Sequence, residues 1–170
     1  MEIKTREDFG KLFESLKKTG VGAEIGVQYG YFSSKIAEFY TGKLLCIDLW
    51  GDENTYEIAK KALSDPEKFK LYRADSLTIA EFVPDNSLDF GYIDANHHYK
   101  EVLADIEAWY PKVRSGGILA GHDYVKYQDI EVIEAVDEWC KKTGYKIKLT
   151  SAPEDYFEGT LFASWWIVKK

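Results

Sequence analysis

The feature that most limits what this chain can fold into is a regular exchange between two hydrophobic periods. Short continuous apolar runs have the length of buried strands, and the segments between them carry apolar residues at helical spacing. Strands that alternate with helices predict an α/β fold, a mostly parallel sheet with helices on both faces. The expected strands are Val21–Gly26, Lys43–Asp48, Lys68–Arg73, Leu88–Asp94 and Gly117–His122, and the expected helices are 31–40, 54–63, 76–81, 98–110 and 129–142.

Both ends of the chain depart from this alternation. The residues from Thr5 to Asp8 match a capping box, and the apolar spacing after them predicts an amphipathic helix over 5–18. Near the other end, Tyr145–Thr150 and Thr160–Val168 have the composition of strands, and no helical pattern separates them. Without a crossover helix, these last two strands are expected to pair antiparallel.

Length and composition favour a folded single domain. The chain has 170 residues, of which 45% are hydrophobic and 30% charged, and its net charge is −7. One domain is therefore expected over 1–170, with the helix at 5–18 followed by a core at 20–170. The negative charge argues against nucleic acid or an anionic membrane as a partner. No secretory signal and no apolar segment near the ~20 residues of a membrane helix is present, so a cytoplasmic location is expected.

The two cysteines offer little chemistry. Cys46 lies inside an apolar run, and Cys140 lies on the expected inner face of a late helix. The chain has no CxxC motif and no cysteine framework, so both residues are interpreted as core thiols.

The turn after the first strand favours one nucleotide cofactor over another. Gly26 and Gly30 stand in a G-x-x-x-G spacing, whereas a dinucleotide site requires G-x-G-x-x-G to approach a pyrophosphate. Glu24, two positions before the first glycine, is a poor neighbour for phosphates but suits the ammonium group of an amino-acid-like ligand. The pattern therefore favours S-adenosylmethionine over NAD.

Acidic residues at the next two strand ends extend this site, because ligands of open parallel sheets bind at the carboxyl ends of the strands. Asp48 is placed to accept both ribose hydroxyls of an adenosine, or else it caps a loop. Trp50 either packs on the adenine or lies in the core. Asp75 and Ser76 follow the third strand and are placed to bind the adenine, unless Asp75 only caps the helix after it.

Together these residues resemble the class I S-adenosylmethionine-dependent methyltransferases. The stretches Ile93-Asp94-Ala95-Asn96-His97-His98-Tyr99 and Gly116-Gly117-Ile118-Leu119-Ala120-Gly121-His122-Asp123-Tyr124 resemble the methyltransferase-24-type family. The resemblance implies a Rossmann-like sheet of seven strands with the last strand antiparallel. It also implies S-adenosyl-L-methionine as cofactor, but it does not give the methyl acceptor.

The resemblance also suggests a metal site. By position, Asp94, His122 and Asp123 correspond to residues that hold Mg²⁺ in related metal-dependent O-methyltransferases. A histidine among the ligands suits Mn²⁺, Fe²⁺, Co²⁺ or Zn²⁺ better than Mg²⁺. Alternatively, Asp94 only orients the methionine end of the cofactor, and His122 and Asp123 form a hydrogen-bonded pair.

All three histidines of the chain flank the expected point of methyl transfer. Asn96 stands where relatives mostly have an acidic residue, and His98 where they have a small one. Because the amide of Asn96 is no useful base, the protein either does without a base or moves this task to a neighbour on the same loop. His97 is the first candidate, His122 the second and His98 the third, because imidazole titrates near neutral pH. We therefore expect the catalytic residues to be His97, Asp94 and His122.

These observations predict methyl transfer to a small molecule, most simply to a hydroxyl oxygen, with or without help from a divalent metal. Aromatic residues in the loops suit a sugar or an aromatic ring as acceptor: Trp50, Tyr56, Tyr124, Tyr127, Tyr156 and Phe157. Two alternatives remain open, a protein that binds S-adenosylmethionine or its product without transferring a methyl group, and a nicotinamide-dependent oxidoreductase. The sequence also leaves open whether the chains form a homo-oligomer.

Overall fold

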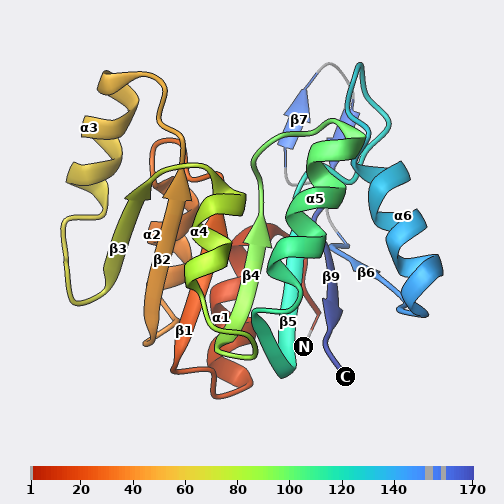
Figure 1. Ribbon diagram of the computed structural model, residues 1–170, viewed down its shortest axis with the longest axis horizontal. Helices are drawn as coiled ribbons and strands as arrows, with labels where there is room; N and C mark the ends of the chain where they lie inside the picture. Colours follow the sequence, from red (N-terminus) through yellow and green to blue (C-terminus); the bar gives the residue numbers. More distant parts are fainter. Residues whose placement is uncertain (1, 152–154, 158–159) are drawn as a thin grey trace.

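The fold is built on one large sheet. The computed structural model describes residues 2–151, 155–157 and 160–170. Seven strands form the sheet in the order β3-β2-β1-β4-β5-β9-β6 (Figure 1). Their bounds are β1 (Val21–Ile25), β2 (Lys43–Asp48), β3 (Phe69–Arg73), β4 (Leu88–Ile93), β5 (Val113–Gly121), β6 (Lys148–Leu149) and β9 (Trp165–Val168).

The strand directions confirm the predicted α/β class. Strands β1 to β5 pair with one another in parallel, whereas β9 pairs antiparallel with both β5 and β6. Every residue of the central strand β4 is buried, which is why its sequence is a continuous apolar run without alternation. The seven-stranded sheet with its last strand antiparallel is therefore confirmed.

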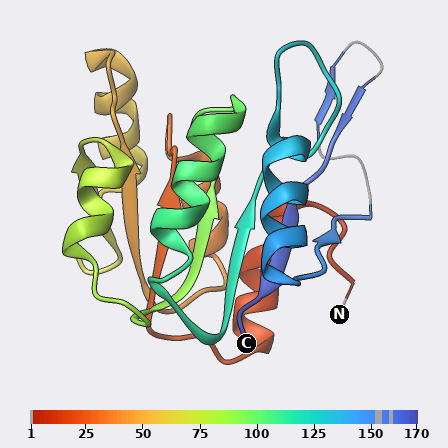
Figure 2. The same cartoon turned by 45° about the vertical axis from the view of Figure 1, so that its right-hand side comes forward.

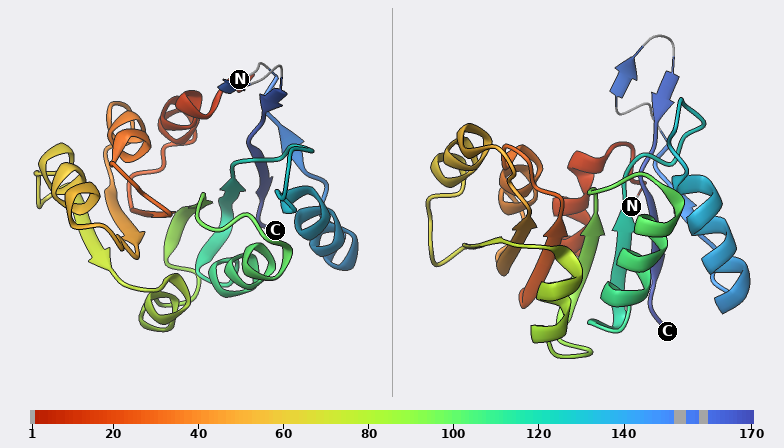
Figure 3. Two further views of the ribbon diagram at one scale, coloured as in Figure 1. Left: turned by 90° about the horizontal axis from the view of Figure 1, so that it is seen from above. Right: turned by 45° about the horizontal axis from the view of Figure 1, so that its top comes forward.

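Helices cover both faces of the sheet, as Figure 3 shows from above. The core cluster on one face contains side chains of α1, α2 and α3, and the cluster on the other face contains those of α4, α5 and α6. A 3₁₀ turn, η1, precedes α1. The bounds are η1 (Arg6–Asp8), α1 (Phe9–Ser15), α2 (Tyr31–Ala37), α3 (Glu53–Ala62), α4 (Ser76–Phe82), α5 (Tyr99–Trp109) and α6 (Val132–Thr143).

Three terminal predictions were wrong in detail. The strand expected over Tyr145–Thr150 is only β6 (Lys148–Leu149). The helix expected over 5–18 begins as the 3₁₀ turn and ends at Ser15. The strand expected over Thr160–Val168 is two strands, β8 (Thr160–Phe162), which pairs with β7 (Asp155–Phe157), and β9. The two strands are separated at Ala163 and Ser164, where the Ser164 N–H donates to the side-chain Oγ1 of Thr150 at 3.0 Å and not to a backbone carbonyl.

Burial agrees with the interpretation of the cysteines. Cys46 and Cys140 are free thiols buried in the two separate core clusters. Burial raises the pKa of Cys46 to about 12 and that of Cys140 to about 11, so neither forms a thiolate readily at neutral pH. Among the described residues, no helix combines the length and hydrophobicity that crossing a bilayer requires.

The core beneath α5 gives a prediction for stability. Trp109 is 0% exposed, whereas Phe82 on the neighbouring helix α4 is 77% exposed. We expect Trp109→Ala to lower the free energy of unfolding by about 3–5 kcal/mol, because it removes a large buried side chain and leaves a cavity. Urea unfolding measures this change. Phe82→Ala is the matched control and should change the value by less than about 0.5 kcal/mol; similar losses in both variants would contradict the buried position of Trp109.

The loops that follow the parallel strands gather at one end of the sheet. In Figures 1 and 2, the segment after β5 and the β7–β8 hairpin both extend beyond the carboxyl end of the sheet, on the side of β5 and α6. The carboxyl ends of β1 to β4 lie at the same end. This edge is where a ligand of an open parallel sheet is expected.

Candidate active site

A cavity of about 660 Å³ opens at the carboxyl ends of strands β1 to β4. Four of the predicted cofactor-binding acids and hydroxyls line it, along with the first glycine of the turn. The lining residues are Ile25, Gly26, Ile47, Asp48, Leu49, Ala74, Asp75, Ser76, Leu77, Asp94, Ala95, Asn96, Lys100, Glu101, Ala104 and Asp105.

The turn after β1 requires glycine at two positions. Gly26 has a φ of +87°, and a Cβ there would lie 2.0 Å from the carbonyl oxygen of Asp94. Gly30 has a φ of +80° and is the N-cap of α2, but it faces Leu63 and does not line the cavity. Gly26 therefore lets the turn after β1 pass close to the end of β4, and Gly30 starts α2. Of the two glycines, only Gly26 borders the cavity.

Asp48 both caps a loop and faces the cavity. Its Oδ2 accepts the N–H groups of Val27 and Gln28, each at 2.8 Å, and its Oδ1 accepts the N–H of Trp50 at 2.7 Å. These bonds use three of the roughly four acceptor positions of a carboxylate. Asp48 thus joins the turn after β1 to the loop after β2 and presents its remaining acceptor capacity at the cavity wall.

The structure corrects the prediction for Trp50. Its side chain is 2% exposed, donates from Nε1 to the carbonyl oxygen of Gln28 at 2.7 Å, and packs on Tyr56 with 5.0 Å between ring centroids. It is a core residue and does not line the cavity. Leu49, which is 68% exposed, lines the cavity beside Asp48 instead.

Two residues after β3 lie in the cavity wall. Asp75 caps α4, since its Oδ2 accepts from the N–H of Thr78 at 2.8 Å, so the helix-capping interpretation holds although Asp75 also lines the cavity. The Ser76 hydroxyl donates to Asp105, a buried residue of α5. Burial raises the pKa of Asp105 to about 6. Sequence reasoning missed Asp105, although a carboxylate on the apolar stripe of α5 was a signal.

Glu24 lies beneath the cavity rather than in its wall. It is 1% exposed and accepts a hydrogen bond from the Ser33 hydroxyl of α2. Burial raises its pKa to about 8 even beside the Arg6 charge, so the carboxyl group is mostly protonated at neutral pH. A nearby positive charge would favour its ionised form.

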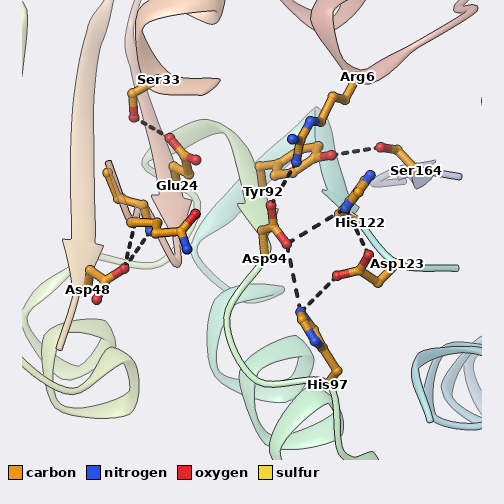
Figure 4. A network of polar contacts seen from close by, with 12 residues as sticks. Arg6, Glu24, Ser33, Asp48, Tyr92, Asp94, His97, His122, Asp123 and Ser164 are labelled. Atoms are coloured by element: carbon orange, nitrogen blue, oxygen red, sulfur yellow. Dashed lines mark hydrogen bonds and ion pairs between the residues drawn. The ribbon is translucent and has the colours of Figure 1, made fainter. Parts of the chain in front are cut away.

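A second group of polar side chains adjoins the cavity at the ends of β4 and β5 (Figure 4). His97 Nε2 lies 2.8 Å from Asp123 Oδ2 and 3.9 Å from Asp94 Oδ1. His122 Nδ1 lies 3.1 Å from Asp123 Oδ1 and 3.9 Å from the same Asp94 oxygen. The structure therefore brings the four predicted residues Asp94, His97, His122 and Asp123 together, and we call them the strand-end cluster.

Charge pairing shifts the pKa values inside the strand-end cluster. Asp123 first, and then Asp94, raise the pKa of His97 to about 10, so its imidazole is protonated at neutral pH. Burial of Asp123 acts to raise its pKa, but the contacts with His122 and His97 outweigh it and hold that pKa below its ordinary value. Asp123 also has a φ of +52°, a costly backbone conformation that often marks a functional position.

The other two residues of the β4 loop have structural contacts. Asn96 lines the cavity, and its Oδ1 accepts the N–H of His98 at 2.9 Å. His98 is the N-cap of α5, and its exposed ring lies 3.8 Å from Glu131. His98 therefore points away from the strand-end cluster, in agreement with its place as the third candidate for the base.

The expected aromatic rim is only partly at this site. Trp50 and Tyr56 pack together beside Asp48, on the α3 side. Tyr127 follows β5 and contacts Phe162 with 5.6 Å between ring centroids, whereas the Tyr124 hydroxyl donates to Asp137 of α6 at 2.7 Å. The side chains of Tyr156 and Phe157 lie outside the described part of the structure.

Comparison with known proteins identifies the family. The model of the methyltransferase-24 family, described as "Methyltransferase domain", matches residues 23–124, which is more than half of the chain. The chain belongs to this methyltransferase family. The resemblance to class I S-adenosylmethionine-dependent methyltransferases is thereby confirmed.

Solved structures share the fold of this methyltransferase at low sequence identity. An O-methyltransferase from Bacillus cereus in complex with SAH has a TM-score of 0.72 and 16% identity, over 96% of this chain and 80% of that one. An rRNA methylase from Streptococcus thermophilus has a TM-score of 0.70 and 16% identity, over 99% of both chains. A curated relative, the uncharacterized protein y4gI of Sinorhizobium fredii, is 26% identical over 114 residues, and the match spans 59% of this chain but only 12% of that protein.

Sequence reasoning missed one residue of this methyltransferase that reaches the site from far away in the chain. Arg6 Nη1 lies 3.2 Å from Asp94 Oδ2, although the two residues are 88 positions apart. Arg6 belongs to the 3₁₀ turn before α1, where its sequence context signals only a helix start. No local pattern could have placed it beside β4.

Proposed function

We propose that this methyltransferase transfers a methyl group from S-adenosylmethionine to a hydroxyl oxygen of a small molecule. The observation that carries the proposal is the adjacency of two features. A cavity with acids at the ends of β2, β3 and β4 meets, at Asp94, a cluster that holds two imidazoles and a second carboxylate. A cofactor seat next to titratable groups is what hydroxyl methylation requires.

The cavity residues suit the nucleoside end of the cofactor. Asp48 offers carboxylate oxygen to ribose hydroxyls, and Leu49 and Ala95 offer apolar surface for the adenine. Asp75 and Ser76 supply polar atoms for the edge of the base. The likeness to a structure that holds SAH supports this seat.

His97 is proposed as the general base. The acceptor oxygen attacks the methyl carbon, the bond from that carbon to sulfur breaks to leave S-adenosylhomocysteine, and the hydroxyl proton passes to His97. Because Nε2 of His97 faces Asp123 at 2.8 Å, Nδ1 is the nitrogen that takes this proton. Holding the oxygen in line with the sulfonium supplies much of the acceleration, since effective molarities reach the order of 10⁵–10⁸ M. His97 is 39% exposed whereas His122 is 5% exposed, so an acceptor reaches His97 more readily.

The strand-end cluster also suits a divalent metal ion. Asp94, His97 and Asp123 each offer one ligand atom, and these atoms lie within 4.8 Å of one another. His122 adds a second imidazole beside the same carboxylates. Since His97 is assigned as the base, we propose that His122 supplies the imidazole ligand and that Asp94 and Asp123 supply the carboxylates. Mixed imidazole and carboxylate ligands favour Mn²⁺ over Mg²⁺. Such an ion would lower the pKa of an acceptor hydroxyl.

The proposed acceptor is a sugar or an aromatic hydroxyl compound. Tyr127 lies in the loop after β5 that also carries Asp123 of the strand-end cluster, and its ring contacts Phe162. The net charge of −7 argues against RNA, although an rRNA methylase shares the fold. Turnover of S-adenosylmethionine to S-adenosylhomocysteine, followed with sugars, catechols and an rRNA fragment as acceptors, tests this. Activity with rRNA alone would contradict a small-molecule acceptor, and no turnover at all would favour a binding protein.

Cofactor binding can be tested independently of the acceptor. Asp48→Ala is expected to weaken S-adenosylhomocysteine binding by at least ~10-fold, because a charged hydrogen bond contributes about 1.5–3 kcal/mol. Calorimetric titration measures the affinity. Asp52→Ala is the matched control, since Asp52 also caps an exposed backbone N–H, that of Thr55, but does not line the cavity. Unchanged affinity in Asp48→Ala, or tighter binding of NAD, would contradict the proposal.

A further inference from the structure

Arg6 lies at the junction between the cavity and the strand-end cluster. Its guanidinium lies 3.2 Å from Oδ2 of Asp94, a cavity-lining residue, and 5.6 Å from the ring centroid of Phe32 (Figure 4). Its charge also acts on the buried carboxyl of Glu24, whose pKa it lowers. Arg6 therefore acts on two acids, Asp94 in the cavity wall and Glu24 beneath the cavity.

The segment that carries Arg6 is held firmly against the fold. Ile3 and Phe9 on either side of it are buried, at 3% and 0% exposure. Asp8 accepts the N–H of Lys4 at 3.1 Å, and the Tyr31 hydroxyl of α2 donates to Glu7 at 2.6 Å. A side chain on such a segment is pre-organised, so a ligand that binds it loses little of its affinity to ordering the protein.

The two oxygens of Asp94 face different partners. Oδ2 faces Arg6, whereas Oδ1 faces His97 and His122, each at 3.9 Å. In Figure 4, Arg6 approaches Asp94 from the side opposite to His97. Arg6 therefore contacts the side of Asp94 that faces away from His97. The other oxygen, Oδ1, faces the two histidines of the strand-end cluster.

The aminocarboxyl end of S-adenosylmethionine is a zwitterion, with an ammonium and a carboxylate on one carbon. Asp94 supplies negative charge for the ammonium, and Glu24 does so once the ammonium favours its ionised form. A carboxylate in the same place needs a cation. We propose that Arg6 binds the α-carboxylate of the cofactor, beside an ammonium held by the negative side of this site. This inference rests on the proposed function, and it makes Arg6 a residue that selects ligands with an intact amino-acid tail.

Guanidinium suits this task because its planar N–H groups match a carboxylate in two parallel hydrogen bonds. A purely structural role is the competing explanation, since Arg6 also ties the N-terminal segment to β4 through Asp94. The two roles differ in one measurable respect. A structural tie affects every ligand of the cavity alike, whereas a carboxylate contact affects only ligands that carry the carboxylate.

Three ligands separate these roles when titrated by calorimetry into the folded protein. S-adenosylhomocysteine has the whole tail, its decarboxylated analogue keeps only the amine, and 5′-methylthioadenosine lacks both groups. Arg6→Gln is expected to weaken binding of S-adenosylhomocysteine by about 10- to 100-fold, the range for losing one charged hydrogen bond. The other two ligands should change by less than about 3-fold. Lys11→Gln, which removes an exposed charge from α1, is the matched control and should change none of them.

The outcomes distinguish this inference from the proposed function. Equal weakening of all three ligands, or no weakening of any, would overturn the carboxylate contact while leaving the cofactor assignment intact. A native protein that binds none of the three would overturn both. If Arg6→Gln does not fold, Arg6→Lys keeps the charge but not the paired donors, and it should still lower the preference for S-adenosylhomocysteine over its decarboxylated analogue; an unchanged preference would overturn the inference.

Discussion

Replacing His97 with Gln is expected to lower the turnover by ~10²–10⁴-fold, the usual contribution of a positioned general base. Glutamine keeps much of the side-chain shape but cannot accept a proton near neutral pH. The measurement is the rate of S-adenosylhomocysteine formation at saturating cofactor and acceptor. Affinity for S-adenosylhomocysteine should stay close to the native value, because His97 does not line the cofactor cavity.

The same variant should change how the rate depends on pH. Asp123, and then Asp94, raise the pKa of His97 to about 10, and a base must be neutral to act. In the metal-free protein the rate should therefore rise with pH, through one ionisation above the ordinary histidine value of ~6.5. The positive sulfonium and a bound dication both oppose the shift and move that ionisation to lower pH. In His97→Gln the ionisation should disappear.

Two neighbouring histidines serve as controls. His98→Gln alters an exposed ring that faces Glu131, so its turnover and pH profile should match those of the native protein. His122→Gln tests the second candidate. If His97→Gln turned over normally while His122→Gln lost both activity and the ionisation, the base would belong to the end of β5 and His97 would be structural.

The parallel part of the sheet was predictable because buried strands and amphipathic helices have different periods. Each expected strand from Val21 to His122 is present, and the helices differ from their predicted bounds by a few residues. Thr160–Val168 was harder, since its composition is that of a single strand. At the break, the Ser164 N–H bonds to the hydroxyl of Thr150, which lies 14 positions away and leaves no local signal.

The candidate site also has a part that the sequence predicts and a part that it does not. Asp48, Asp75, Ser76 and Asp94 follow parallel strands, so the fold alone brings them to one edge of the sheet. The position of a residue near a strand end does not predict whether its side chain is buried. Trp50 lies in the core, and Glu24 lies under the turn after β1 instead of beside the cavity.

The place of Arg6 beside Asp94 is the feature of the site that no sequence motif predicts. Its position beside Asp94 depends on how η1 and α1 pack against α2 and on the loop that leads to β1. These contacts are tertiary, and they connect residues 88 positions apart. A motif describes residues around one strand end, so it omits a side chain that enters the site from another part of the chain.

Removing divalent metal is expected to lower methyl transfer by about 100-fold or more, since a metal ion that stabilises developing charge contributes several kcal/mol. Dialysis against a chelator, with elemental analysis before and after, measures the loss. S-adenosylhomocysteine affinity should be largely unchanged, because His122 and Asp123 do not line the cofactor cavity. Added Mn²⁺ should restore the rate better than Mg²⁺.

Asp123→Ala should imitate the chelator, because it removes a proposed ligand that lies within reach of both His97 and His122. Asp129→Ala, an exposed carboxylate in the same loop, is the matched control and should keep both metal and activity. Charge links the metal ion to the protonation of His97. Without the dication, the carboxylates hold the proton on His97 more strongly. The residual rate of the chelated protein should therefore rise over a higher pH range than the rate of the metal-loaded protein. Full activity after chelation, with no metal detected, would instead indicate an enzyme that relies on His97 alone.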